Sequence, residues 1–494
     1  MDFWPSRAVW LIMASKAGSE LRAIFTLCWP TCCCSMLLFS FQFVNMIGAG
    51  QMGTETLAAV SLANSFFNIV SYFAVGAATS IDTLVSQAYG RKAVVECQAW
   101  LVRALVIFTL ACIPLCGVLA AAAPIFRAFG LAADLVDMAE LYIFRLLPGT
   151  PCFILFNVLQ KYQQSMNIMI PALAVLFFSN LLNVGATMWV VKSGDISSLA
   201  WVLTAVRVLT FFLMAGALIT LSPEWRSCRI DNGKTERPIK LWSWTPVRRL
   251  LLLSFAGAFM TGLEACAFEA TVLAAAKVGQ NSLDAHNVLL QCISLFYLAV
   301  PLGISVAATI RVGNLLGDGE AQLARLSAHL CVAIGTTFML VSGTGLIVMR
   351  HSLGHAFTSD RRVIAKVASV APVAACFQII DGFQGVSAGV MRAIGQQAFL
   401  AKSIFVAFYC VALPFGFWLC FGLQWGILGL WISLALGLAL MAIVYGHRVF
   451  WGIDWLQEAH CASDSHSPSP WRKFSSPLLA TRFSGMSHEV SNGT

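Results

Sequence analysis

The sequence predicts an all-α integral membrane protein with twelve transmembrane helices in two six-helix halves. Three observations predict this class. The 494 residues are 59% hydrophobic, with a mean hydropathy of +0.79. Only 11% are charged, whereas soluble domains average about a quarter. Apolar stretches long enough to cross a bilayer recur from one end of the chain to the other.

Hydropathy places twelve apolar segments, each at least as long as the roughly 20 residues that a transmembrane helix needs. Several are longer than this, so those helices must tilt, bend or project into water. The predicted spans cover residues 22–48, 57–88, 98–124, 138–160, 170–192, 197–222, 248–276, 286–312, 326–350, 369–394, 400–421 and 425–447.

Lys and Arg residues gather in short segments on one side of the membrane if the N-terminus is cytoplasmic, which is the positive-inside pattern. The net charge of +8 therefore marks topology and does not indicate nucleic-acid binding. We expect both termini in the cytoplasm, and a location in the plasma membrane or a vacuolar or other organelle membrane. The expected parts are a cytoplasmic N-terminus (1–21), a first lobe (22–222), a cytoplasmic linker (223–247), a second lobe (248–447) and a disordered cytoplasmic tail (448–494) rich in Ser, Pro and His.

The two halves resemble each other around their second helices. GAATSIDTLVSQAYGRK in the first half matches GISVAATIRVGNLLGDG in the second when the chain is shifted by 227 residues, which aligns Gly76 with Gly303 and Gly90 with Gly317. Because both segments have the same topology, the shift predicts two parallel bundles related by an axis along the membrane normal, with a substrate path between them.

Four acidic residues lie at membrane depth. Glu264 and Glu269 share the apolar stretch LLLLSFAGAFMTGLEACAFEATVLAAA, and Asp381 and Asp82 lie in two other spans. A carboxylate at this depth is costly, and its usual reason is a proton or cation pathway. Residues five apart on a helix are turned by roughly 140°, so we expect one glutamate to face the central cavity and the other the lobe interior. For Asp82, a helix-packing hydrogen bond or a pair with Arg91 is an equal alternative.

Other polar residues at depth either line a cavity or bond across helices. The candidates for cavity lining are Asn64, Asn68, Asn180, Asn183, Gln291 and Gln384. Aromatic side chains such as Tyr72 and Tyr297 could stack on a planar cation. The deep ionisable residues are mostly acidic, with Arg207 as the main exception. Arg311 and Arg392 end two spans, where anchoring at the membrane interface is expected.

Several segments resemble the multidrug and toxin extrusion (MATE) family in the right order and at the right separations. They are LAAVSLANS with DTLVSQAYG, LQKYQQSMN, PLGISVAATIRVGNLLGDG, DGFQGVSAGVMRAIGQQ and GILGLW, and the resemblance covers roughly residues 25 to 450. It implies the MATE-type fold, with twelve helices in two lobes that face the two sides of the membrane alternately.

The resemblance implies export of organic cations and other xenobiotics, driven by an inward gradient of protons or of sodium; we expect protons. Glu264 and Glu269 match the glutamate pair on helix seven of eukaryotic members, Asp381 the acid on helix ten of animal members, and Asp82 the first-lobe signature. Two positions depart from the family pattern. Asn45 stands where many prokaryotic members have a coupling aspartate, and Gln291 and Cys292 stand where some animal members have a further glutamate.

The expected partners are a small organic cation or other xenobiotic and membrane lipid, with no nucleic acid, and the expected state is a monomer. No cofactor or metal is predicted, because a gradient of protons, or of sodium, drives the transport. No phosphate-binding loop or nucleophile–base arrangement is present in the sequence, so an enzyme is not expected. The alternatives are a sodium-coupled exporter, an exporter of organic anions or secondary metabolites, a flippase for lipid-linked precursors, and a receptor or scaffold without transport.

Overall fold

The computed structural model describes residues 7–192, 195–221 and 241–464. Eleven of its helices are long and apolar enough to cross a membrane, and a bent pair makes a twelfth span. This agrees with the twelve predicted spans. The bent pair corresponds to the predicted span 138–160: its two helices meet at 53°. The break falls at Leu147 and Pro148, where the proline ring cannot be accommodated in a straight helix.

The first six spans are built from α1 to α8 and the second six from α10 to α18. The first half contains α1 (Arg7–Met52), α2 (Thr54–Gly90), α3 (Val94–Ala120), α4 (Ala122–Ala128), α5 (Ala133–Leu146), α6 (Gly149–Ser165), α7 (Ile170–Val191) and α8 (Ile196–Leu221). The second half contains α10 (Trp244–Val278), α11 (Gln280–Ala299), α12 (Pro301–Gly317), α13 (Ala321–Val348), α14 (Arg350–Leu353), η1 (Gly354–Ala356), α15 (Arg361–Ala393), α16 (Gln397–Ile404), η2 (Phe405–Ala412), α17 (Leu413–Phe417), η3 (Trp418–Gly422), α18 (Ile427–His447), η4 (Arg448–Gly452) and α19 (Trp455–Ser463).

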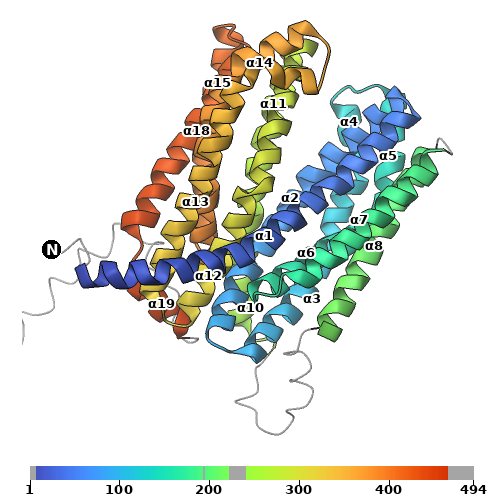
Figure 1. The fold of residues 1–494 in the computed structure, drawn as a ribbon. Helices are drawn as coiled ribbons and strands as arrows, with labels where there is room; N and C mark the ends of the chain where they lie inside the picture. The colour runs from blue at the N-terminus through green and yellow to red at the C-terminus, as the bar shows by residue number, and fades with distance from the viewer. Residues whose placement is uncertain (1–6, 193–194, 222–240, 465–494) are drawn as a thin grey trace, which may run out of the picture.

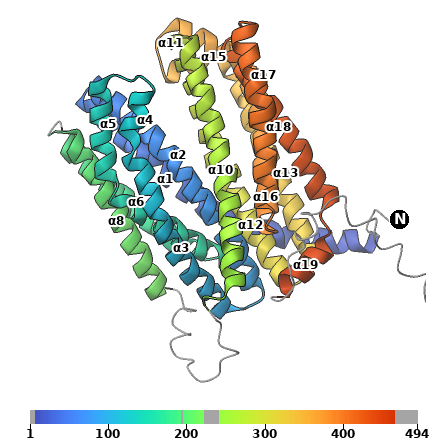
Figure 2. The same ribbon diagram turned by 180° about the vertical axis from the view of Figure 1, so that it is seen from behind.

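The two bundles diverge toward the end that carries α4 and α14 and converge at the end that carries α19 (Figures 1 and 2). Hydrogen bonds fasten the converging end. The hydroxyl of Thr83 donates to the Arg392 carbonyl at 2.6 Å, and the amide of Gln87 donates to the Ala393 carbonyl at 2.9 Å. The amide of Gln397 donates to Thr83 at 2.8 Å. The converging end is therefore the closed end of this structure.

Glycines let the bundles approach closely along α2. Gly76 and Gly257 face each other, so a Cβ on either would overlap the other's carbonyl oxygen. A Cβ on Gly90 would lie 2.9 Å from the Cα of Gly317. Gly90 and Gly317 are the residues that the 227-residue shift aligns, and equivalent residues that touch lie beside the axis that relates the halves.

Helix α1 belongs to both bundles. Ile24, Leu27 and Cys28 pack into the core of the second bundle. Glu20 pairs with Arg311 of α12 through contacts of 2.5 and 3.0 Å, which ties the first part of α1 to the second bundle. Beyond Pro30, which interrupts the helix, α1 packs mainly against α7 of the first bundle.

The prediction that residues 448–494 form a disordered tail is wrong for residues 448–463. Residues 448–452 extend α18 as η4, and Trp455–Ser463 form α19; residues 465–494 and most of the predicted linker lie outside the described residues. Asp454 caps α19, because its carboxylate accepts a hydrogen bond from the Gln457 amide at 3.1 Å.

Helix α19 packs across the closed end. Its buried residues Trp455, Ala459 and Ala462 face the protein, and the helix contacts α12 and α13 of the second bundle and α2 of the first. The guanidinium of Arg91, between α2 and α3, donates to the Ala462 carbonyl. Burial of this apolar face explains why the segment is ordered despite its polar composition.

We expect the docking of α19 to weaken as pH rises. Burial raises the pKa of the Glu458 carboxyl to about 7, although Arg448 nearby lowers it. The docked helix therefore binds the proton more tightly than the undocked helix, whose glutamate titrates near 4.3. Docking is strongest below that value, and it loses free energy until pH passes 7. Hydrogen exchange of residues 455–463, corrected for intrinsic rates, should be faster at pH 8 than at pH 5.5.

The variant Glu458→Gln tests the cause of this pH dependence. It should protect the α19 amides equally at both pH values, whereas Glu320→Gln, at the N-terminus of α13, should keep the native response. An unchanged pH dependence in Glu458→Gln would assign the effect to another group.

Candidate functional site

The acidic residues of the second bundle meet around α10, α11 and α15. Glu264 and Asp381 lie close enough for their charges to act on each other, and both act on Tyr297 of α11. Gly385, one turn after Asp381, makes room for the tyrosine, because a Cβ there would lie 2.5 Å from the Tyr297 hydroxyl. Two acidic groups and a phenol thus share one polar cluster inside the second bundle.

Glu269 has different surroundings. It lies within electrostatic reach of Tyr72 on α2 and of Cys266 on its own helix. Because Tyr72 belongs to the first bundle, Glu269 is directed to the space between the lobes, while Glu264 is directed into the second lobe. Both glutamate residues are of intermediate exposure, and Tyr72 is 46% exposed. A ligand between the lobes could therefore touch Glu269 and an aromatic ring together.

Two further residues complete the cluster around Glu264. Tyr445 of α18 lies within electrostatic reach of Glu264, and its hydroxyl donates to the Leu400 carbonyl at 3.4 Å. Gln384, three residues after Asp381 on α15, is 3% exposed. Arg392 also reaches the field of Glu264, and its guanidinium donates to the Ser305 hydroxyl at 2.8 Å. The Arg392 side chain therefore joins α15 to α12, and its place at the membrane interface stays a prediction.

The remaining predicted residue of the second lobe is separate from this cluster. Gln291 is exposed on α11, next to the buried Cys292. The structure places no acidic group at these two positions. The three acidic groups predicted at membrane depth in the second lobe are therefore supplied by α10 and α15.

The predicted asparagines of the first bundle mostly join helices. The Ser40 hydroxyl donates to the side-chain oxygen of Asn180 at 2.5 Å, and the Asn180 amide donates to the Leu37 carbonyl at 2.8 Å. Asn45 donates weakly to Asn183 at 3.5 Å. Asn180 and Asn183 are 7% and 0% exposed, so in this structure they hold α1 to α7 instead of lining an open cavity.

Asn68 and Asn64 differ from this pair and from each other. Asn68 exchanges hydrogen bonds of 2.7 and 3.3 Å with Gln42 of α1. Asn64 is buried, and its amide nitrogen has no partner among the described residues. An unsatisfied buried donor is costly, so Asn64 is the asparagine in this set that is free to meet a ligand.

Asp82 lies apart from the other acids. Its carboxylate accepts a hydrogen bond from the Lys161 ammonium of α6 at 2.6 Å. Arg91, its alternative partner in the sequence analysis, pairs instead with Glu96 at 2.9 Å. The Asp82 side chain is 3% exposed and that of Lys161 13% exposed, so the two form a buried ion pair within the first bundle.

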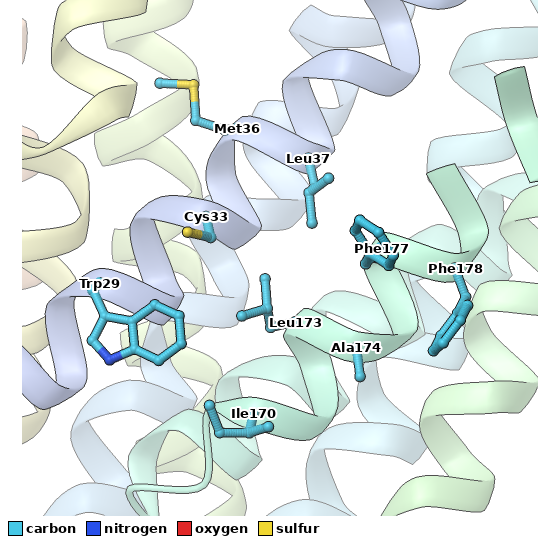
Figure 3. A pocket seen from close by; sticks show the side chains of 9 residues that line it. All are labelled: Trp29, Cys33, Met36, Leu37, Ile170, Leu173, Ala174, Phe177 and Phe178. Atoms are coloured by element: carbon cyan, nitrogen blue, oxygen red, sulfur yellow. The ribbon is translucent and has the colours of Figure 1, made fainter. Parts of the chain in front are cut away.

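An apolar groove lies between α1 and α7 (Figure 3). It has a volume of about 610 Å³, and no polar surface lines it. The lining residues are Trp29, Cys33, Met36, Leu37, Ile170, Leu173, Ala174, Phe177 and Phe178. Because it offers no charge or hydrogen bond, it is suited to lipid chains and not to the recognition of a cation.

The MatE family model matches residues 30–189 and 257–418, which is more than half of the chain. The chain belongs to the MatE family. The two matched segments fall on the two bundles, and each contains part of the polar groups described above. As a MATE-family secondary transporter the protein is not an enzyme, which confirms that prediction.

Named relatives and solved structures agree with membership in the MATE family. The chain is 30% identical over 431 residues to multidrug and toxin extrusion protein 2 of Mus musculus, covering 86% of this chain and 73% of the relative. It is 26% identical to Protein DETOXIFICATION 13 of Arabidopsis thaliana, covering 86% and 88%. The crystal structure of the eukaryotic MATE transporter AtDTX14 superposes with a TM-score of 0.82 at 22% identity, covering 90% of this chain and 99% of that chain.

Sequence reasoning missed part of the candidate site. Tyr445, Ser403 and Arg392 lie close to Glu264 or to its neighbours, but an isolated tyrosine or serine in an apolar span does not reveal which way it faces. The position of Arg392 could have been predicted from the sequence, because it follows Asp381 by eleven residues on one helix. Eleven residues make about three turns, so the two side chains lie on the same face.

Proposed function

We propose that this MATE protein exports organic cations or related xenobiotics in exchange for protons. The observation that carries the proposal is the pair of acidic groups, Glu264 and Asp381, gathered at membrane depth with a third acid, Glu269, facing the other lobe. A carboxyl group in a low-dielectric site can hold a proton, and a bound cation competes with that proton. The relative named multidrug and toxin extrusion protein 2 supports this substrate class.

Competition between the proton and the cation at one site drives net export only if the inward-open and outward-open states differ in their affinity for these ligands. The hydrogen bonds of Thr83, Gln87 and Gln397 close one end of the structure, and they must break for that end to open. We place both termini in the cytoplasm from the distribution of Lys and Arg, which makes this conformation open to the outside. The protein acts as a monomer in this proposal, in the plasma membrane or an organelle membrane.

The test is transport by the purified chain in proteoliposomes loaded with a fluorescent organic cation. With the cation at equal concentration on both sides, an inward proton gradient should drive net efflux, and nigericin, which collapses the proton gradient in potassium buffer, should stop it. Efflux that follows an imposed sodium gradient and ignores pH would replace the proton with sodium. If neither gradient moves a cation, the substrate class is wrong, and organic anions and lipid-linked precursors become the next substrates to test.

A further inference from the structure

Arg207 is a buried cationic group that the proposed proton and cation pathway does not use. It lies on α8, eleven residues after Ile196, and therefore about 16 Å along the helix. Its guanidinium carbon lies 4.1 Å from the centre of the Phe67 ring and 5.2 Å from that of Phe153. Nitrogen Nη1 is buried without a hydrogen-bond partner. Among the described residues, no carboxylate forms an ion pair with it.

The packing of α8 fixes what surrounds this group. The Thr204 hydroxyl donates to the Arg145 carbonyl at 2.6 Å, and a Cβ on Gly149 would lie 3.1 Å from the Thr204 Cα. Arg207, one turn further along α8, therefore lies beside the beginning of α6, where Phe153 is the fifth residue. Helix α6 begins at the break in the bent span, and the N-terminus of a helix carries partial positive charge. Broken helices at the membrane midplane present such ends to anionic groups.

Two more unsatisfied polar groups lie on helices that surround the guanidinium, Tyr142 on α5 and Asn64 on α2. Tyr142 is 0% exposed and its hydroxyl has no partner, and it lies within electrostatic reach of Arg207. Asn64 is 7% exposed with an unpartnered amide nitrogen. It precedes Phe67 by three residues, so both side chains lie on the same face of α2. Three elements thus bring hydrogen-bond donors without acceptors to one region of the first bundle.

We propose that Arg207, Tyr142 and Asn64 form a binding site for a small monovalent anion. An unpaired guanidinium in a low-dielectric interior is costly, and stacking on Phe67 offsets only part of this cost. An anion would satisfy the guanidinium and both unpartnered donors together. Chloride and the carboxylate of an organic substrate share this chemistry. The second lobe offers acids and the first lobe offers this basic site, so the two lobes bind groups of opposite charge.

The test is thermal unfolding of the purified full-length chain in detergent. Sodium chloride or sodium benzoate replaces sodium sulfate at constant ionic strength, and the midpoint is followed against anion concentration. A ligand that binds the folded state raises the midpoint in a saturable manner. We expect that rise in the native chain and not in Arg207→Met. The control Arg127→Met removes an exposed arginine that pairs with Asp137, and it should respond like the native chain.

A second variant keeps the test decisive if Arg207→Met does not fold. Tyr142→Phe removes a hydroxyl that bonds to nothing in the fold, so the protein should fold normally and bind the anion about fivefold more weakly. Saturation by chloride assigns the site to an inorganic anion, and saturation by benzoate alone assigns it to a substrate carboxylate. If neither anion separates the native chain from both variants, the proposal is overturned and Arg207 is a packing residue stacked on two phenylalanines. Because the measurement is of binding, it is independent of whether protons drive cation export.

Discussion

Proton-driven efflux of an organic cation is expected to fall about 100-fold when Glu269 is replaced by glutamine, which corresponds to a coupling free energy near the upper end of the usual range. Glutamine keeps the size of the side chain but can neither release a proton nor attract a cation. Glu269 is half-buried, and its charge acts on the Tyr72 hydroxyl across the lobe interface. Its loss should remove the competition between proton and substrate without disturbing the packing of either lobe.

The measurement is efflux from proteoliposomes at a fixed proton gradient, together with the thermal unfolding midpoint of the same preparation. Asp284→Asn is the matched control, because Asp284 lies on α11 and is partnered by exposed Gln280 at 2.9 Å. It should transport normally. Gradient-driven efflux by Glu269→Gln at the native rate would remove Glu269 from the coupling mechanism.

The second large effect is on stability. Asp82→Asn leaves the Lys161 ammonium charged and almost buried, and loss of one partner of a buried pair costs about 3 to 5 kcal/mol. Asp82→Asn combined with Lys161→Met removes both charges and should recover most of that loss, because neutral groups of similar size are often tolerated at such positions. Thermal unfolding of the two single variants, the double variant and the native chain completes a double-mutant cycle.

Transport by the double variant separates the two roles that the sequence left open for Asp82. A folded double variant that transports normally makes the carboxylate a packing residue. A folded double variant without gradient-driven efflux makes it a coupling residue. The 2.6 Å contact with Lys161 favours the first result, because the ion pair occupies the carboxylate.

The spans were predictable from the sequence, since a bilayer demands long apolar segments whatever their partners are. Glu264, Glu269 and Asp381 were also predictable as candidates, because a carboxylate is conspicuous in such a segment. Their grouping was not. Glu264 precedes Asp381 by more than a hundred residues, and the rotation of each helix that brings them together is set by packing against neighbours.

Local signals were present where two predictions failed. Asp454 followed by WLQEAHCA has the cap and the apolar spacing of a short helix, but hydropathy averaged over a long window does not detect nine residues. Lys161 lies just beyond the predicted span 138–160, yet it is part of α6, which continues to Ser165. The sequence offered no link between Lys161 and Asp82, which are 79 residues apart.

The division of α1 between the bundles has a consequence for how the chain is made. Ile24, Leu27 and Cys28 are synthesised first, yet the core that they complete includes Ile304 and Ile310, which leave the ribosome nearly three hundred residues later. Until the second bundle is synthesised, α1 must lie in the bilayer with one apolar face against lipid. A chain cut between the halves would therefore produce a second fragment whose core lacks the residues that cover it, although all six of its own spans are intact.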